Sequence, residues 1–249
     1  YSLWQKKIEL DNLVVRDAEF YSIIDSLGNK SRILAGKSNK SDSIHHEMLV
    51  EAHNIRIIDS KVYFENQVKK NRTSLTIRKA WFDLAPQDSL LIFHGHLEGH
   101  LDSLISNDSR LFANQPIQAN EIEISINRFN GIKELTNGYL QAHTLKLFPK
   151  LKLKPHEDGQ IIELNISGED NFDAFLDLFE FHSGLDLQQV NSKSKLNLTY
   201  HQSGFVNPFQ RPFSELIFEI TDAEFTGEAL PFPLKVIDIR GNYNNGEGH

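Results

Sequence analysis

A histidine-rich segment, His94-Gly95-His96-Leu97-Glu98-Gly99-His100, holds the side chains of this chain that are best suited to chemistry. Alternate residues of a β-strand share a face. The residues expected to point the same way are His94, His96, Glu98, His100 and Asp102. Two imidazoles at i and i+2 can ligate one metal ion, since zinc takes nitrogen ligands at about 2.0–2.1 Å. No second group in the sequence has ligand spacing, so the favoured interpretation is the solvent face of a half-buried sheet, without metal or cofactor.

Other catalytic templates are absent from the sequence. It has no Gly-x-Ser-x-Gly, no phosphate-binding glycine loop, no His-Glu-x-x-His and no cysteine. Carboxylates are plentiful, and a glycosidase needs only two of them at a suitable separation, which a sequence does not reveal. An enzyme, either a glycosidase or a histidine-metal hydrolase, is therefore the least favoured of the function classes kept open.

The composition excludes several partners. The 249 residues carry a net charge of −8 and have no basic stripe, which argues against nucleic acid and against electrostatic adsorption to anionic lipid. Without cysteine there is no disulfide framework and no thiolate zinc site. No apolar run approaches the roughly 18 residues of a membrane span. One local exception to the acidic balance is a basic turn predicted at 68–73, which contains Lys69, Lys70 and Arg72.

The elements that must position these residues are β-strands. Apolar and polar residues alternate with period two along most of the chain, which is typical of strands that are half buried. The dipeptides Asn130-Gly131 and Asn137-Gly138 are of the kind that hairpin turns use. A single extended β-repeat domain is predicted over 1–249, as a mainly β, elongated, curved antiparallel sheet.

A recurring phrase supports a repeat. Strand-like runs lead into Asp17-Ala18-Glu19-Phe20-Tyr21, into Asp59-Ser60-Lys61-Val62-Tyr63 and into Asp222-Ala223-Glu224-Phe225. A turn or Asx role is favoured over catalysis for the three aspartates. Repeat architectures place function on a long shared surface more often than in one cleft. Glycine inside a strand usually marks a bend, a bulge or the close approach of another backbone, and Gly95 and Gly99 are interpreted as points of curvature.

One segment departs from period two. From about 170 to 183 the apolar residues fall at helical spacing, with Asp170 or Asn171 as candidate caps and Gly184 as a candidate end. The stripe consists of Phe172, Phe175, Leu176 and Phe179. Two interpretations stay open, a helix packed on one side of the sheet and a lid or plug over an apolar groove.

The chain resembles the AsmA-like family. The resemblance rests on the 204–246 region, with Phe225-Thr226-Gly227, Leu230-Pro231-Phe232-Pro233-Leu234 and Ile239-Arg240-Gly241-Asn242-Tyr243-Asn244-Asn245-Gly246. The phrases at 8–21, 50–66 and 90–104 are also similar to strand pairs of that family.

The resemblance implies a bacterial envelope protein. Such proteins (the AsmA, TamB and YhdP group) have an inner-membrane anchor, which would lie outside this chain, and a periplasmic body. The body resembles a taco-shaped sheet with an apolar concave side, as in the bridge-like lipid transfer proteins of eukaryotes. Phospholipid passage and outer-membrane homeostasis are then expected, with acyl chains and envelope proteins as partners and no catalytic residues.

An apolar groove of this kind has candidate lining residues in the sequence. Acyl chains offer no hydrogen bonds to recognise, so a lining of aliphatic and phenyl groups suffices. The candidates are Leu91, Phe93, Leu97, Leu101, Ile122, Ile124, Ile126, Leu164, Ile166, Phe218 and Ile220. Each could instead be ordinary core. The main alternative function is a structural or adhesive β-repeat module, which would bind protein or glycan through loops such as 26–43 and have no groove.

Overall fold

The computed structural model describes residues 7–29, 31, 49–106, 109–142, 144–171, 191–192, 194–207, 210–226, 232 and 234–246. The described part of the chain is mainly β and contains no helix. Its strands are β1 Lys7–Asp11, β2 Val14–Arg16, β3 Glu19–Ile24, β4 Leu49–Asn66, β5 Asn71–Gln87, β6 Leu90–Ser106, β7 Ser109–Asn127, β8 Lys133–Ala142, β9 Leu145–His156, β10 Gly159–Asn171, β11 Asn191–Ser192, β12 Lys195–Val206, β13 Phe213–Thr226 and β14 Leu234–Asn244.

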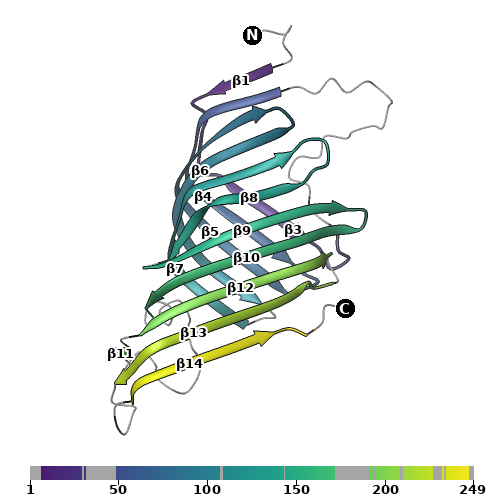
Figure 1. Cartoon of the computed structure of the whole chain (residues 1–249). Helices are drawn as coiled ribbons and strands as arrows, with labels where there is room; N and C mark the ends of the chain where they lie inside the picture. The colour runs from purple at the N-terminus through teal and green to yellow at the C-terminus, as the bar shows by residue number, and fades with distance from the viewer. Residues whose placement is uncertain are drawn as a thin grey trace.

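All these strands belong to one 14-stranded sheet, which is open and curved (Figure 1). From β4 onward the neighbouring strands are antiparallel, and most are consecutive in sequence. The prediction of one curved, mainly β sheet is confirmed. The N-terminal edge adds a feature that the prediction lacked, because β1, β2 and β3 pair with β4 in parallel and make the sheet mixed.

The parallel edge is an in-register repeat. Lys7 pairs with Leu49, Val14 with Arg56 and Glu19 with Lys61, so that paired residues are 42 positions apart on all three strands. The first two copies of the recurring phrase therefore lie side by side. Their tyrosines, Tyr21 and Tyr63, stack with ring centroids 4.9 Å apart. The sequence repeat is thus a repeat of structure at this edge.

The recurring aspartates interrupt strands. Asp17, Asp59 and Asp222 have φ of 51°, 49° and 53°, a left-handed backbone that Asp and Asn tolerate better than most residues. Asp59 and Asp222 lie within β4 and β13, where the prediction had a turn. Left-handed residues of the same kind occur inside strands at Asn54, Asn114 and Glu121. Register shifts flank Asn54, Glu121 and Asp222, which identifies these breaks as β-bulges.

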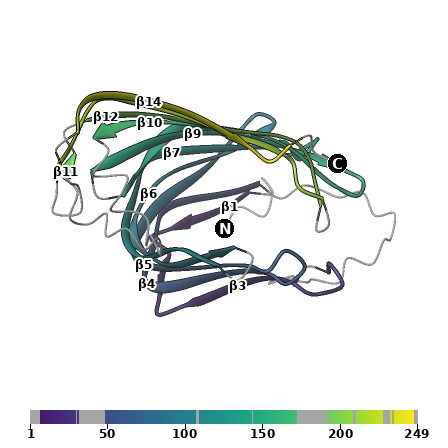
Figure 2. The ribbon, with the colours of Figure 1, turned by 90° about the horizontal axis from the view of Figure 1, so that it is seen from below.

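The bulges let unusually long strands bend. Strands β4 to β7 have 17 to 19 residues, against a typical length of about five or six. Figure 2 shows β6 and β7 curving from the layer of β9 to β14 round to the layer of β4 and β5. Bulges bend a strand and increase its twist, so the curvature follows from them.

A contact between distant parts of the chain confirms that the sheet curls. The Lys69 ammonium, in the β4–β5 turn, donates a hydrogen bond of 2.7 Å to the carbonyl of Gln210, in the β12–β13 loop. Strands β5 and β12 are six steps apart in the sheet. In a flat sheet six steps of about 4.8 Å would separate them by about 29 Å. The β4–β5 turn and the β12–β13 loop can meet only because the sheet folds back on itself.

Two local predictions need correction. Asn137-Gly138 does not form a hairpin turn, because both residues lie inside β8 with Gly138 at φ 118° and the register shifts around them. Asp170 and Asn171 do not cap a helix, because β10 continues through both, pairing them with Leu196 and Lys195. The remainder of the predicted helix, with Phe172, Phe175, Leu176 and Phe179, lies outside the described residues, as does most of the 26–43 loop.

Candidate functional site

The sheet has one apolar and one polar face, and two adjacent rows of paired residues display them. The first, here called the apolar row, runs from β4 to β14 through residues that pair one with the next. Its members are Ile57, Ala80, Leu97, Ala119, Leu140, Leu147, Gly168, Leu198, Phe218 and Gly241. No polar side chain interrupts it across ten strands.

The next line of paired residues, here called the polar row, consists of polar side chains. Its members from β5 to β14 are Lys79, Glu98, Gln118, Gln141, Lys146, Glu169, Asn197, Glu219 and Arg240. Opposite charges meet on it, as in the 2.6 Å contact between Arg240 and Glu219. Because alternate residues point to opposite faces, these two rows mark the two sides of the sheet.

The apolar face is the protected one. Ala80 is 4% exposed, and Leu145 and Leu196 are each 1% exposed, whereas the Arg240 side chain on the other face is 80% exposed. All described strands belong to one sheet, so no second sheet covers these residues. A single curved sheet shields the side that it curls around, which makes the apolar face the concave face (Figure 2).

All eleven groove candidates lie on this concave face. The register links Phe93 to Ile124 across β6 and β7, Leu164 to Leu151 across β10 and β9, and Phe218 to Leu198 across β13 and β12. Ile220 is buried and the other ten are half-buried, an intermediate exposure for large apolar side chains. They are thus placed where a groove lining would be, and most keep accessible surface.

A pocket of about 250 Å³ opens on the apolar face where β5, β6 and β7 meet. It is lined by Trp81, Phe82, Phe93, His94, Gly95, His96, Ile122 and Ile124. Three of the sequence candidates, Phe93, Ile122 and Ile124, are therefore brought together around Gly95. Apolar pockets lined by aromatic and aliphatic groups are the usual sites for apolar ligands.

The two strand glycines, which were interpreted as points of curvature, lie where the backbones of β5 and β6 approach closely. A Cβ on Gly99 would lie 2.2 Å from the carbonyl oxygen of Thr76, and one on Gly95 would lie 2.9 Å from that of Trp81. The register of β5 against β6 shifts between Ile77 and Lys79, beside Gly99. Glycine is therefore required here by contact between strands.

Sequence reasoning missed the small residues of the apolar row. Ala80 and Ala119 are short members, and Gly168 and Gly241 are packed by the side chains of Leu147 and Phe218. Strand alternation predicts which face Leu145, Leu147, Leu196 and Leu198 occupy, so the signal for these leucines was present. The glycines give no such signal, because a pattern of alternating apolar side chains cannot include a residue that has no side chain.

The histidine strand lies on the polar face, as its alternation predicts. His96 uses both ring nitrogens within the sheet, Nδ1 at 2.7 Å from Asn120 Oδ1 and Nε2 at 3.2 Å from Glu98 Oε1. His94 Nδ1 lies 3.6 Å from Glu123. Asp102 accepts hydrogen bonds from the Ser74 and Thr76 hydroxyls of β5. The structure thus gives these side chains separate partners.

The charged members of this network stabilise one another. Arg78 donates to Glu98 at 2.6 Å, and that hydrogen bond, followed by the one from His96, holds the pKa of the Glu98 carboxyl below its ordinary value. Within the described ranges, no three His, Asp or Glu side chains gather closely enough to hold a metal ion. The arrangement is that of a hydrogen-bonded polar surface.

A second pocket, of about 450 Å³, opens beside this network. It is lined by Trp81, His94, Gly95, His96, Asn120, Glu121, Ile122, Asn137 and Tyr139. Its aromatic and amide side chains form a mixed lining, and Trp81 is 37% exposed. Tryptophan and tyrosine often occur at binding surfaces because each combines an apolar ring with a polar group.

Comparisons of the chain with protein-family models, with curated proteins and with solved structures found no match. Among the described residues, no helix has the length and apolar character needed to cross a membrane.

Proposed function

We propose that the concave apolar face, here called the trough, holds the acyl chains of phospholipids and lets them pass along the sheet. The observation that carries this proposal is the apolar row, ten residues from β4 to β14 without a polar side chain, beside a row that is entirely polar. Among the described residues no second sheet covers this apolar face, and an uncovered apolar face needs a partner.

The chemistry of the lining suits acyl chains. Aliphatic and phenyl side chains offer no hydrogen bonds, and a methylene buried against them contributes about 0.8 kcal/mol whatever its place in the chain. Along a continuous apolar row, an acyl chain finds equivalent apolar contacts on each successive strand. Such a surface suits movement of the acyl chain better than binding at one fixed position. The protein acts by holding its ligand and has no catalytic step in this proposal.

The resemblance to AsmA-like proteins supplies the setting of the proposal. The sheet would be a periplasmic body, tethered to the inner membrane by a segment outside these residues, and would serve outer-membrane homeostasis together with envelope proteins. The curved single sheet supports this setting, because it has the shape that the resemblance implies.

Lipid recovered with the protein tests the proposal. We expect native mass spectrometry of the gently purified chain to detect bound phospholipid in roughly stoichiometric amount, and organic extraction to release it. The apo protein mixed with phospholipid vesicles and then re-isolated should regain it. A clean apo mass from both preparations would remove the support for lipid binding and favour a β module with a closed, dry face.

A specific observation favours a second candidate function, the binding of glycans on the polar face. The 450 Å³ pocket lies within the usual range of about 300–1,000 Å³ for small ligands, and its lining includes Trp81, Tyr139 and two asparagines. We expect soluble oligosaccharides to quench the fluorescence of Trp81, read as the difference between the wild type and Trp81→Phe. An unchanged difference spectrum across a panel of neutral and acidic oligosaccharides would dismiss this candidate.

A further inference from the structure

The outer side of the parallel edge repeats a surface that the sheet already binds elsewhere. Asn12 and Tyr21 of the edge correspond to Asn54 and Tyr63 of β4, since the register relates the two copies by 42 positions. The backbone is repeated too, because φ is 59° at Asn12 and 52° at Asn54. The interface between β4 and the edge therefore shows which contacts one copy of this phrase makes with the next.

Side chains form ladders across this interface. The Asn54 side-chain amide donates a hydrogen bond to Asn12 Oδ1, and the rings of Tyr21 and Tyr63 stack with an interplanar angle of 12°. Asparagine ladders and stacked aromatic rings stabilise parallel strands that lie in register. Asn12 and Tyr21 are both exposed, Tyr21 to 45%, so each has a second side on which the same contact can be repeated.

Burial differs between the two copies. Ala52 and Ile55 of β4, which has strands on both sides, are 1% and 8% exposed. The residues 42 positions earlier, Leu10 and Leu13, are apolar as well but are 41% and 44% exposed. The edge copy thus lacks the neighbouring strand that covers its counterpart.

The edge also offers backbone hydrogen bonds. The carbonyl of Ile24 in β3 accepts a hydrogen bond from β4, so by strand alternation the backbone groups of Glu19, Tyr21 and Ile23 turn to the outer side. At Ile23 the chain itself occupies that side, because Ser31 donates to the Ile23 carbonyl at 2.7 Å and accepts from its N–H at 2.9 Å. Among the described strands, β4 is the sole neighbour of β1, β2 and β3. Exposed edges of this kind are templates for strand addition.

We infer that the parallel edge binds an extended strand of a partner protein, which lies parallel to β1–β3 and repeats the phrase of β4. That phrase is an asparagine, an apolar residue three positions later, an aspartate five positions later and a tyrosine nine positions later. The apolar residue is required because Val15 pairs with Ile57 and extends the apolar row to β2. Glu19 pairs with Lys61, so a basic residue seven positions after the asparagine complements the edge.

A peptide with the sequence of β4, residues 49–66, is the probe. It carries every residue of the phrase, and it is the segment with which the edge already pairs on its inner side. We expect fluorescence anisotropy of the labelled peptide to show saturable binding to the lipid-free full chain, with a dissociation constant below about 1 mM. Asn54→Ala/Tyr63→Ser in the peptide should weaken binding at least about tenfold, through the loss of one side-chain hydrogen bond and one ring stack.

Two further peptides separate register from composition and leave the protein unchanged. Deleting Ile58 brings the asparagine one position closer to the tyrosine, and a slip of one residue turns the side chains beyond it to the opposite face. This peptide should bind as weakly as the double variant. Glu65→Gln supplies the matched control, because Glu65 pairs with Ile23, where Ser31 already covers the edge. It should bind like the original peptide.

A photoreactive benzophenone in place of the Tyr63 ring locates the bound peptide. Parallel, in-register binding should crosslink it to Tyr21 or its neighbours in β3, identified by mass spectrometry of the digested complex. A crosslink to β1 would indicate antiparallel binding, and one to β14 would indicate the opposite edge of the sheet. Either of these results would overturn the inference.

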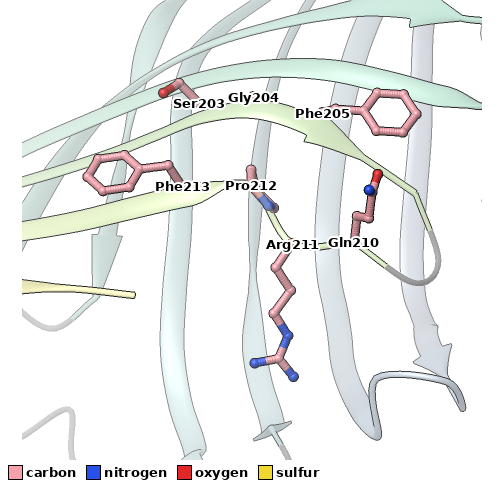
Figure 3. A pocket seen from close by; sticks show the side chains of 7 residues that line it. All are labelled: Ser203, Gly204, Phe205, Gln210, Arg211, Pro212 and Phe213. Atoms are coloured by element: carbon pink, nitrogen blue, oxygen red, sulfur yellow. The ribbon is translucent and has the colours of Figure 1, made fainter. Parts of the chain in front are cut away.

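A pocket between β12 and β13 competes for an aromatic side chain of the peptide. It has a volume of about 290 Å³ and is lined by Ser203, Gly204, Phe205, Gln210, Arg211, Pro212 and Phe213. Figure 3 shows the rings of Phe205 and Phe213 on either side of Gly204 and Pro212. Since the edge is the inferred site, Phe205→Ala in the protein should leave peptide binding unchanged.

Three further outcomes would count against the edge. They are equal binding of the original and the deletion peptide, a crosslink in the β12–β13 pocket that Phe205→Ala abolishes, and no saturable binding at all. The inference does not depend on lipid in the trough, because the binding is measured without lipid. A failure of the lipid experiment and a failure of the peptide experiment are therefore distinguishable.

Discussion

Leu97→Glu is expected to reduce the phospholipid recovered with the protein at least about tenfold, while the chain still folds. Leu97 lies inside the apolar row, between Ala80 of β5 and Ala119 of β7, and is half-buried. A carboxylate at this position faces water when the trough is empty. It would lose that water against alkyl chains, at a cost of several kcal/mol for an unpaired charge.

The control places the same charge on the other face. Gln118 pairs with Glu98 on the polar row, one residue away from Ala119, and is exposed. Gln118→Glu should leave the recovered lipid unchanged, and mass spectrometry of extracts from equal amounts of folded protein measures both variants. If Leu97→Glu keeps a wild-type load of lipid, the apolar row is not the lining, and the proposed function loses the observation on which it rests.

Gly99→Val is expected to lower the free energy of unfolding by about 3 kcal/mol, the upper range for overpacking a tight contact. Its Cβ would lie 2.2 Å from the Thr76 carbonyl oxygen and 3.3 Å from the Ile77 Cα, both backbone atoms of β5. Neither can move aside as a side chain would. The paired strands must separate locally, where β5 and β6 shift register and Ile77 is buried.

Thermal unfolding followed by circular dichroism measures this effect, which should be a fall in melting temperature of about 6–12 °C for a domain of this size. The adjacent His100→Val supplies the control, since His100 is exposed on the same strand and valine suits a strand. The two variants should differ clearly. A Gly99→Val protein as stable as His100→Val would mean that β5 and β6 are not in close contact there.

The sequence predicted the faces of the strands well because the signal is local. Leu91, Phe93, Leu97 and Leu101 are two or four positions apart along β6, and the pleat of a strand alone places them together. The same reasoning placed His94 and His96 on the opposite face. It erred at Asn137-Gly138, where a dipeptide common in hairpins forms an irregularity within β8, because the pairing of both neighbouring strands outweighs a local turn preference.

The pairing of strands and their register could not be predicted in the same way. The parallel edge pairs residues 42 positions apart, and the apolar row joins side chains from ten strands, including Gly168 and Gly241, which have no side chain for a pattern to detect. Asp59 and Asp222 were predicted to have a turn or Asx role, and the structure places both inside strands with a left-handed backbone. Whether such a residue ends a strand or forms a bulge within it depends on the neighbouring strand.

The sequence by itself determined that this chain is mainly β, with strands that have one dry and one wet side, because period-two alternation is a property of short segments. Only the tertiary structure decided that the dry side is concave and that Lys69 meets Gln210 across its open side. These features arise from bulges in long paired strands and from a contact 141 residues apart, and such pairings depend on the whole sheet.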